Sequence, residues 1–80
     1  LWPTYEILGR LTEEIGEVAS CINVEFGHKK LKPGEKKGDL GEEIGDVIYA
    51  LICLANTQNI NLSERFIRVM EKHRTSAKEI

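Results

Sequence analysis

The sequence has 80 residues and a formal net charge of -2, from 11 basic and 13 acidic residues. A chain of this length forms one domain at most, which we place at residues 1–80, and a unit of this size buries only about 60% of the surface that its unfolded chain exposes, so we expect an oligomer. The nearly balanced charge excludes attraction of the whole chain to nucleic acid or to an anionic membrane, and we expect neither as a partner.

The first predicted helix runs from Thr4 to about Phe26. Apolar residues recur along it at helical spacing, and Thr4 is a candidate N-cap. Its middle, L-T-E-E-I-G-E-V, holds Glu13, Glu14 and Glu17. Glu14 and Glu17 are one turn apart and share a helix face, where like charges repel. Either these acids are solvated, or a cation sits between them.

A loop and a second helix follow. Residues 28–38, H-K-K-L-K-P-G-E-K-K-G, hold five lysines and predict an exposed connection, although a flexible cation near a phosphate site could also hold substrate. Asp39 begins the second helix, because Asp39 and Glu42 have the spacing of a capping box, and the helix continues to about Thr57. Its centre, V-I-Y-A-L-I-C-L-A, is apolar on every side, which predicts that protein covers it all round.

The segment Q-N-I-N-L-S-E turns the chain into a third helix. Asn61 and Glu64 repeat the capping pattern, and the apolar stripe of this helix reaches Ile80. His73 lies on the stripe, so we expect a buried or interfacial histidine. No segment predicts a strand. The fold class is therefore all-α, with a three-helix chain that assembles into an antiparallel, four-helix-bundle-like homodimer or homotetramer.

The cysteines predict a cytoplasmic location. Cys21 and Cys53 each lie in an apolar helical run, and two thiols do not make a disulfide framework, so we expect reduced, buried thiols. The longest apolar run, residues 47–55, is far shorter than the ~20 residues of a membrane span, and no signal peptide is visible. Because the sequence begins on Leu1, we expect a few residues to precede it.

Acids at the start of the second helix indicate a cation. Glu43 and Asp46 stand three residues apart on a side shared with apolar residues, as Glu14 and Glu17 do at the edge of the first helix's stripe. Four partly buried carboxylates are untenable unless protons or cations neutralise them. With no His or Cys at ligand spacing, these hard oxygen donors favour Mg²⁺ or Mn²⁺ over zinc. Because Mg²⁺ often binds substrate phosphates, the cluster indicates phosphate-ester or phosphoanhydride chemistry.

At these residues the sequence resembles the MazG-like, all-α nucleoside triphosphate pyrophosphohydrolases. The segments E-E-I-G-E, residues 13–17, and E-E-I-G-D, residues 42–46, are similar to the family signature E-E-x-x-E…E-x-x-D, and the similarity continues from residue 42 to His73. The resemblance implies Mg²⁺-dependent hydrolysis of a nucleoside triphosphate to the monophosphate and pyrophosphate, which would cleanse the nucleotide pool. It also implies a set of metal ligands: Glu14, Glu17, Glu43 and Asp46.

Further roles follow from the resemblance. Glu13 matches an acid that is proposed to activate the attacking water in some relatives. Lys72 matches a lysine that faces the phosphates, but Ser76 stands where an arginine is expected, and Arg74 could replace that arginine only if the helix end frays. Asn56 is a candidate nucleotide contact, against the alternative of a local cap.

Other interpretations stay open beside this one. A helical interaction or metal-binding module could keep the fold without turnover, as Ser76 allows, and a phosphoribosyl-ATP pyrophosphatase would have similar metal chemistry. The acids could also be solvated, since the helix dipole favours them near a helix start. Trp2 and Tyr5 could stack on a base or pack against a neighbouring helix. A di-iron bundle is disfavoured, because no Glu has a His three residues later.

Overall fold

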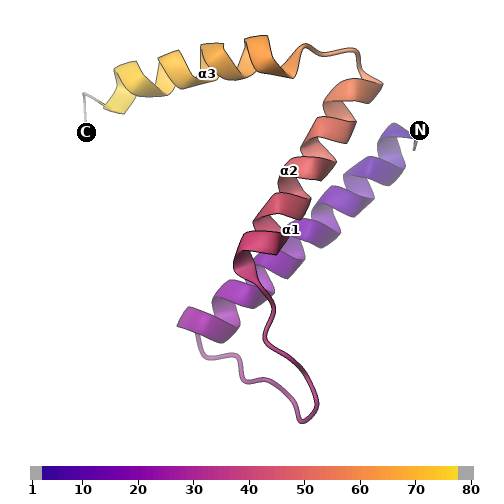
Figure 1. Cartoon of the computed structure of the whole chain (residues 1–80), viewed down its shortest axis with the longest axis vertical. Helices are drawn as coiled ribbons and strands as arrows, with labels where there is room; N and C mark the ends of the chain where they lie inside the picture. The colour runs from indigo at the N-terminus through magenta and orange to yellow at the C-terminus, as the bar shows by residue number, and fades with distance from the viewer. Residues whose placement is uncertain (1–2, 78–80) are drawn as a thin grey trace.

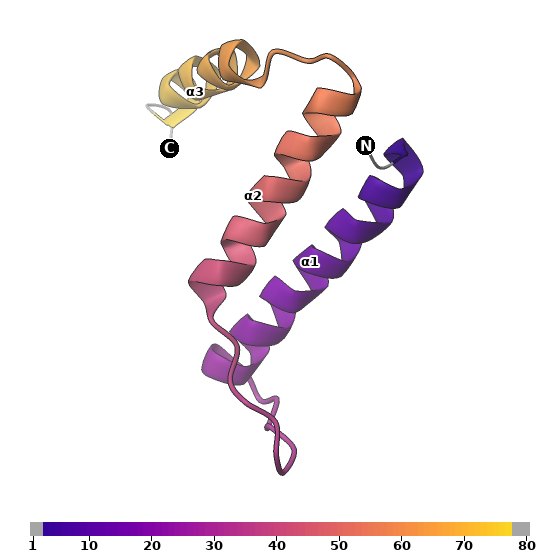
Figure 2. The ribbon, with the colours of Figure 1, turned by 45° about the vertical axis from the view of Figure 1, so that its right-hand side comes forward.

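A computed structural model describes residues 3–77, which form three α-helices and no strand. They are α1 (Thr4–Phe26), α2 (Leu40–Thr57) and α3 (Leu62–Ala77). Helices α1 and α2 lie side by side as an antiparallel hairpin, and α3 extends away from the far end of α2 (Figures 1 and 2). The all-α, three-helix prediction is confirmed. Trp2 and Ile80 lie outside the described residues.

Side-chain caps start α2 and α3 as predicted. The backbone N–H of Glu42 donates to Asp39 Oδ1 at 3.2 Å, and that of Glu64 donates to Asn61 Oδ1 at 3.1 Å. Each bond satisfies one of the backbone donors that a helix start leaves without a partner. The sequence pattern therefore placed both helix starts correctly.

The predicted cap at Thr4 is wrong. Pro3 occupies the N-cap position, Thr4 is the first helical residue, and no side chain caps α1. The Pro3 carbonyl accepts hydrogen bonds from the N–H groups of Glu6 and Ile7 at 2.9 and 3.1 Å. Because the carbonyl of Pro3 accepts the first hydrogen bonds of α1, the helix begins one residue earlier than the hydroxyl pattern indicated.

The loop of residues 28–38 is exposed throughout, as predicted. It reverses at Pro33–Gly34, where the φ of 86° at Gly34 suits the third position of a type II turn. Its end then approaches α1 so closely that a Cβ on Gly38 would lie 2.7 Å from the Sγ of Cys21. The loop therefore needs glycine at both points.

A Schellman motif ends α2 and directs the chain toward α3. The N–H of Ile60 donates to the Ala55 carbonyl at 3.0 Å, and that of Asn59 donates to the Asn56 carbonyl at 3.3 Å. Asn59 has a φ of 54°, which Asn tolerates better than most residues. The turn carries α3 off the hairpin.

One chain encloses very little core. Among the described residues the buried apolar side chains are two from each hairpin helix, Ile7, Cys21, Ala50 and Ala55. No large described side chain is fully buried. The radius of gyration is 16.2 Å, against about 12 Å for a compact chain of this length. One chain therefore leaves most of the apolar surface of its three helices exposed.

The apolar faces of α2 and α3 are open to solvent in the single chain. Ile48 is 51% and Tyr49 70% exposed, so the chain itself does not supply the predicted cover of α2. Because α3 makes at most marginal contact with the hairpin, His73 is exposed as well. The expectation of a buried His73 is wrong for one chain, and an interfacial position stays a prediction. No helix in the described part of the chain has the length and apolar character to cross a bilayer.

Candidate functional site

Three of the predicted metal ligands lie together between the two hairpin helices. One carboxylate oxygen from each of Glu14, Glu43 and Asp46 lies within 4.8 Å of the other two. Glu14 comes from the middle of α1, and the other two come from the first turns of α2, one turn apart. The hairpin register brings them to the same level. Three hard oxygen donors this close suit a divalent cation such as Mg²⁺.

Glu17 stands outside this group of three. Glu17 and Asp46 are exposed, whereas Glu14 and Glu43 are half-buried, so the expectation that all four acids are partly buried is wrong for the single chain. The reason is that α1 and α2 cover the acids from one side only. Glu17 is one turn beyond Glu14 and remains close enough to act on Glu43 electrostatically.

The environment of Glu43 disfavours its negative charge. Partial burial is the largest effect that raises the pKa of Glu43 above its usual value. The carboxylates of Glu17 and Asp46 raise this pKa further, followed by those of Glu14 and Glu42. A cation among these groups would relieve the repulsion.

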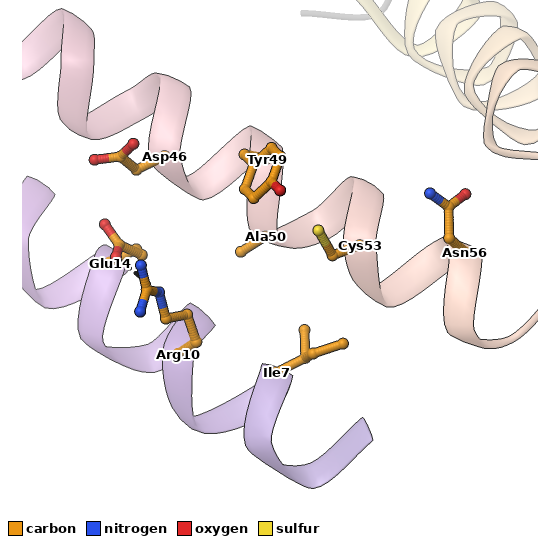
Figure 3. Close-up of a pocket in the computed structure, with 8 residues that line it drawn as sticks. All are labelled: Ile7, Arg10, Glu14, Asp46, Tyr49, Ala50, Cys53 and Asn56. Carbon is orange, nitrogen blue, oxygen red and sulfur yellow. Dashed lines mark ion pairs between the residues drawn. The ribbon is translucent and has the colours of Figure 1, made fainter. Parts of the chain in front are cut away.

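A cavity of about 420 Å³ adjoins the acids (Figure 3). This volume is within the usual range for small-molecule sites. The carboxylates lie at one end of the cavity, and Ile7 and Asn56 lie at the other. Both hairpin helices contribute to its lining, which consists of Ile7, Arg10, Glu14, Asp46, Tyr49, Ala50, Cys53 and Asn56.

The side chain of Asn56 lines the cavity, so a contact with nucleotide stays a prediction for it. The backbone carbonyl of Asn56 takes part in the cap of α2. Two other lining residues, Arg10 and Tyr49, were not identified from the sequence as site residues. Their spacing could have indicated them, because Arg10 is one turn before Glu14 and Tyr49 one turn after Asp46.

The remaining predicted site residues lie outside both the lining of the main cavity and the group of three acids in one chain. Glu13 is exposed and lines a separate shallow depression on α1 with Glu6, Gly9 and Arg10. Lys72 and Arg74 are exposed on α3, which departs from the end of α2 opposite the acids. Arg74 pairs with Glu71 at 2.8 Å. The roles of Glu13, Lys72 and Arg74 stay predictions.

Both cysteines are free, and Cys21 is buried as predicted while Cys53 is half-buried. Burial raises the pKa of the Cys21 thiol, and the nearby Glu43 carboxylate raises it further. A thiol held in its protonated form is a poor nucleophile. Cys21 is therefore a packing residue.

In the absence of metal at pH 7, we expect Glu43→Gln to raise the midpoint of thermal unfolding. The pKa of Glu43 is higher in the folded protein than its ordinary value of 4.5, so the folded state prefers the protonated carboxyl. The stability that the protonated Glu43 carboxyl contributes is fully present below its pKa in the unfolded chain. It is lost as the pH rises through its pKa in the folded protein. The advantage of the variant should therefore shrink as the pH falls from 7 to 4.5. Melts in EDTA across this range measure it.

The same melts with Mg²⁺ provide the control. Mg²⁺ at one hundred times its Kd should stabilise the wild type by about 2.7 kcal/mol and the Gln variant much less. A wild-type midpoint that does not move on addition of Mg²⁺ would contradict a metal site at these acids.

Comparisons with known proteins identify the family of this chain. The family profile described as "MazG nucleotide pyrophosphohydrolase domain" matches residues 4–80. The protein YpjD of Bacillus subtilis (strain 168), described as uncharacterized, is 45% identical over 73 residues, which cover 91% of this chain and 66% of YpjD. The chain thus spans slightly less than two thirds of that relative.

Two crystal structures have a similar fold. YpjD from Bacillus subtilis, described only provisionally as a pyrophosphatase, has a TM-score of 0.72 at 44% identity, over 89% of this chain and 72% of that chain. The Bacillus-conserved MazG protein, described as a nucleotide pyrophosphohydrolase, has a TM-score of 0.71 at 35% identity, over 90% of this chain and 67% of that chain.

Proposed function

Because the chain belongs to the MazG nucleotide pyrophosphohydrolase family, we propose that it hydrolyses nucleoside or deoxynucleoside triphosphates to the monophosphate and pyrophosphate, with Mg²⁺ as cofactor. One observation carries the proposal. Three carboxylates from two helices lie within 4.8 Å of one another, and two of them, those of Glu14 and Asp46, line one end of a cavity of about 420 Å³. The free thiols of Cys21 and Cys53 suit the reducing cytoplasm, where we place this nucleotide-cleansing enzyme.

The acids would hold the metal. Glu14, Glu43 and Asp46 would be the first ligands, and Glu17, one turn along α1, would be the fourth. Bound Mg²⁺, or Mn²⁺ in its place, would neutralise phosphate charge and supply a nucleophilic water. Glu43 and Asp46 are three residues apart on α2, so the helix fixes the distance between these two ligands. Together with Glu14 on α1, they would hold the ion from both helices.

The cavity orients the nucleotide along the hairpin. We place the triphosphate at the acid end and the nucleoside past Ala50 and Cys53 toward Asn56, because these residues follow one another along the cavity (Figure 3). Those two side chains offer an apolar wall, and the amide of Asn56 offers both a donor and an acceptor to a base or sugar. The ring of Tyr49, 70% exposed in the single chain, offers a stacking surface.

The products test the proposal. A panel of standard, deoxy and oxidised nucleotides and phosphoribosyl-ATP is incubated with protein and Mg²⁺ or Mn²⁺, and pyrophosphate and orthophosphate are assayed separately. We expect pyrophosphate without orthophosphate, since the sequence has no Walker-type phosphate loop. Orthophosphate as the product would refute the proposal. An intact panel would favour the interaction module, and cleavage of phosphoribosyl-ATP alone would favour the dedicated enzyme.

We also expect a homodimer or homotetramer, with masses that are multiples of 9.1 kDa in light scattering. Covering the exposed faces of α2 and α3 with a second copy would bury the apolar surface that one chain leaves open. It could also bring Lys72 and Arg74 of one copy to the acids of another.

Substitutions on and off the apolar face make this test specific. Ile48→Asp on α2 should yield monomer or unfolded chain, because it places a charge at the centre of the proposed contact. Leu31→Asp, in the exposed loop, is the matched control and should leave the mass unchanged. A folded wild-type monomer of 9.1 kDa would contradict the oligomer.

A further inference from the structure

Arg10 places a permanent positive charge at the acid end of the cavity. Its Nε lies 3.5 Å from Oε1 of Glu14, and its side chain lines the same cavity as Glu14 and Asp46. Figure 3 shows the guanidinium beside the Glu14 carboxylate. One of the three clustered acids is thus already paired with a cation that belongs to the protein.

The order of this pair gives little reason to regard it as a helix-stabilising device. On an α-helix, an acid four residues before a base stabilises more than the reverse order. Glu64 and Arg68 on α3 have the favourable order and lie 2.8 Å apart, whereas Arg10 precedes Glu14 and its contact is longer. The position of Arg10 on the cavity wall beside the acids also brings its charge close to whatever the cavity binds.

The pair is also easy to rearrange. The Arg10 side chain is 55% exposed and that of Glu14 is 15% exposed. An ion pair with one partner this exposed contributes little to stability, so its loss costs the fold little. A divalent ion that takes Glu14 would compete with the guanidinium for the same carboxylate and would repel it.

We infer that Arg10 is a substrate-binding residue that changes partner when the site fills: it neutralises Glu14 before the metal binds, and it then holds a phosphate oxygen of the triphosphate. This inference rests on the proposed function. A triphosphate at the acid end brings anionic oxygens within the cavity that Arg10 lines. The planar guanidinium stays charged and matches phosphate oxygens with two parallel hydrogen bonds, which lysine cannot reproduce.

Two effects of opposite sign follow from the loss of this charge. In Arg10→Ala, Mg²⁺ should bind more tightly, by up to about tenfold, because a competing cation is gone. The same change should weaken binding of a polyphosphate by about tenfold, because a charged hydrogen-bond donor is gone. An arginine that only paired with Glu14 to support α1 could tighten Mg²⁺ binding on its removal, but its removal would leave the polyphosphate affinity unchanged.

The experiment uses the full chain and two calorimetric titrations. Mg²⁺ alone is titrated into the wild type, Arg10→Ala, Arg10→Lys and the control Arg68→Ala, which breaks an ion pair of the same i,i+4 spacing on α3. The preformed magnesium complex of inorganic tripolyphosphate is then titrated in saturating Mg²⁺. We expect Arg10→Lys to keep wild-type metal affinity and to lose part of the tripolyphosphate affinity. Arg68→Ala should match the wild type in both titrations.

Either titration can overturn the inference. Unchanged or weaker Mg²⁺ binding by Arg10→Ala would overturn the exchange of partners, and unchanged tripolyphosphate affinity would overturn the contact with phosphate. Circular dichroism checks the helix content, and Arg10→Gln, which keeps the aliphatic stem, replaces the Ala variant if that variant does not fold. Because neither titration needs turnover, a wild type that leaves every nucleotide intact would refute the proposed function while the two titrations still decide the role of Arg10.

Discussion

Glu43→Gln is expected to reduce pyrophosphate release by at least about 10³-fold, because a metal ion typically supplies several kcal/mol of transition-state stabilisation and this variant weakens its binding. Glu43 is half-buried and contributes one of three oxygens within 4.8 Å of one another. The amide keeps the shape of the side chain and removes the charge that attracts the ion. Pyrophosphate release at saturating nucleotide, and at a Mg²⁺ concentration that just saturates the wild type, measures the loss.

Glu42→Gln is the matched control for this experiment. Glu42 is the preceding residue of the same helical turn, is exposed, and lies outside the group of three clustered acids. The substitution leaves the backbone N–H of Glu42 in place, and this group donates the capping hydrogen bond to Asp39 Oδ1. We expect nearly wild-type release. Equal losses in Glu42→Gln and Glu43→Gln would mean that the metal site has been assigned to the wrong acids.

Glu13→Gln should lower kcat by about 10²–10⁴-fold, the usual contribution of a general base, with Mg²⁺ affinity unchanged. Glu13 lies in the shallow depression on α1 and not on the wall of the main cavity. Arg10 lines both hollows and pairs with Glu14, so we expect the attacking water between Glu13 and the acid end of the main cavity. Steady-state kinetics combined with Mg²⁺ calorimetry separate a base from a metal ligand.

Glu6→Gln serves as the control, because Glu6 lines the same depression two turns earlier. It should retain the wild-type kcat. If Glu13→Gln also retained the wild-type kcat, another group would have to accept the proton. If it lost Mg²⁺ affinity together with kcat, Glu13 would belong to the metal site.

The local structure of this protein could be predicted from short stretches of its sequence. The starts of α2 and α3 depend on bonds between residues three apart, Asp39 with Glu42 and Asn61 with Glu64, so the pattern contains all the information needed. The exposed loop follows from its lysines, proline and glycines. The paired acidic segments indicated the family, and the match of the family profile to residues 4–80 confirmed it. Only the start of α1 was misplaced, because the backbone of Pro3 outweighed the hydroxyl of Thr4.

Contacts between helices required the tertiary structure. Periodicity says which residues share a face, but the rotation and register of two packed helices decide which side chains meet. That is why Glu14, Glu43 and Asp46 come within 4.8 Å of one another while Glu17 stands outside this group, and why Arg10 and Tyr49 line a cavity that no single segment indicates. The separation of α3 from the hairpin was likewise not predictable, because its amphipathic pattern specifies a face to be covered and leaves open which chain covers it.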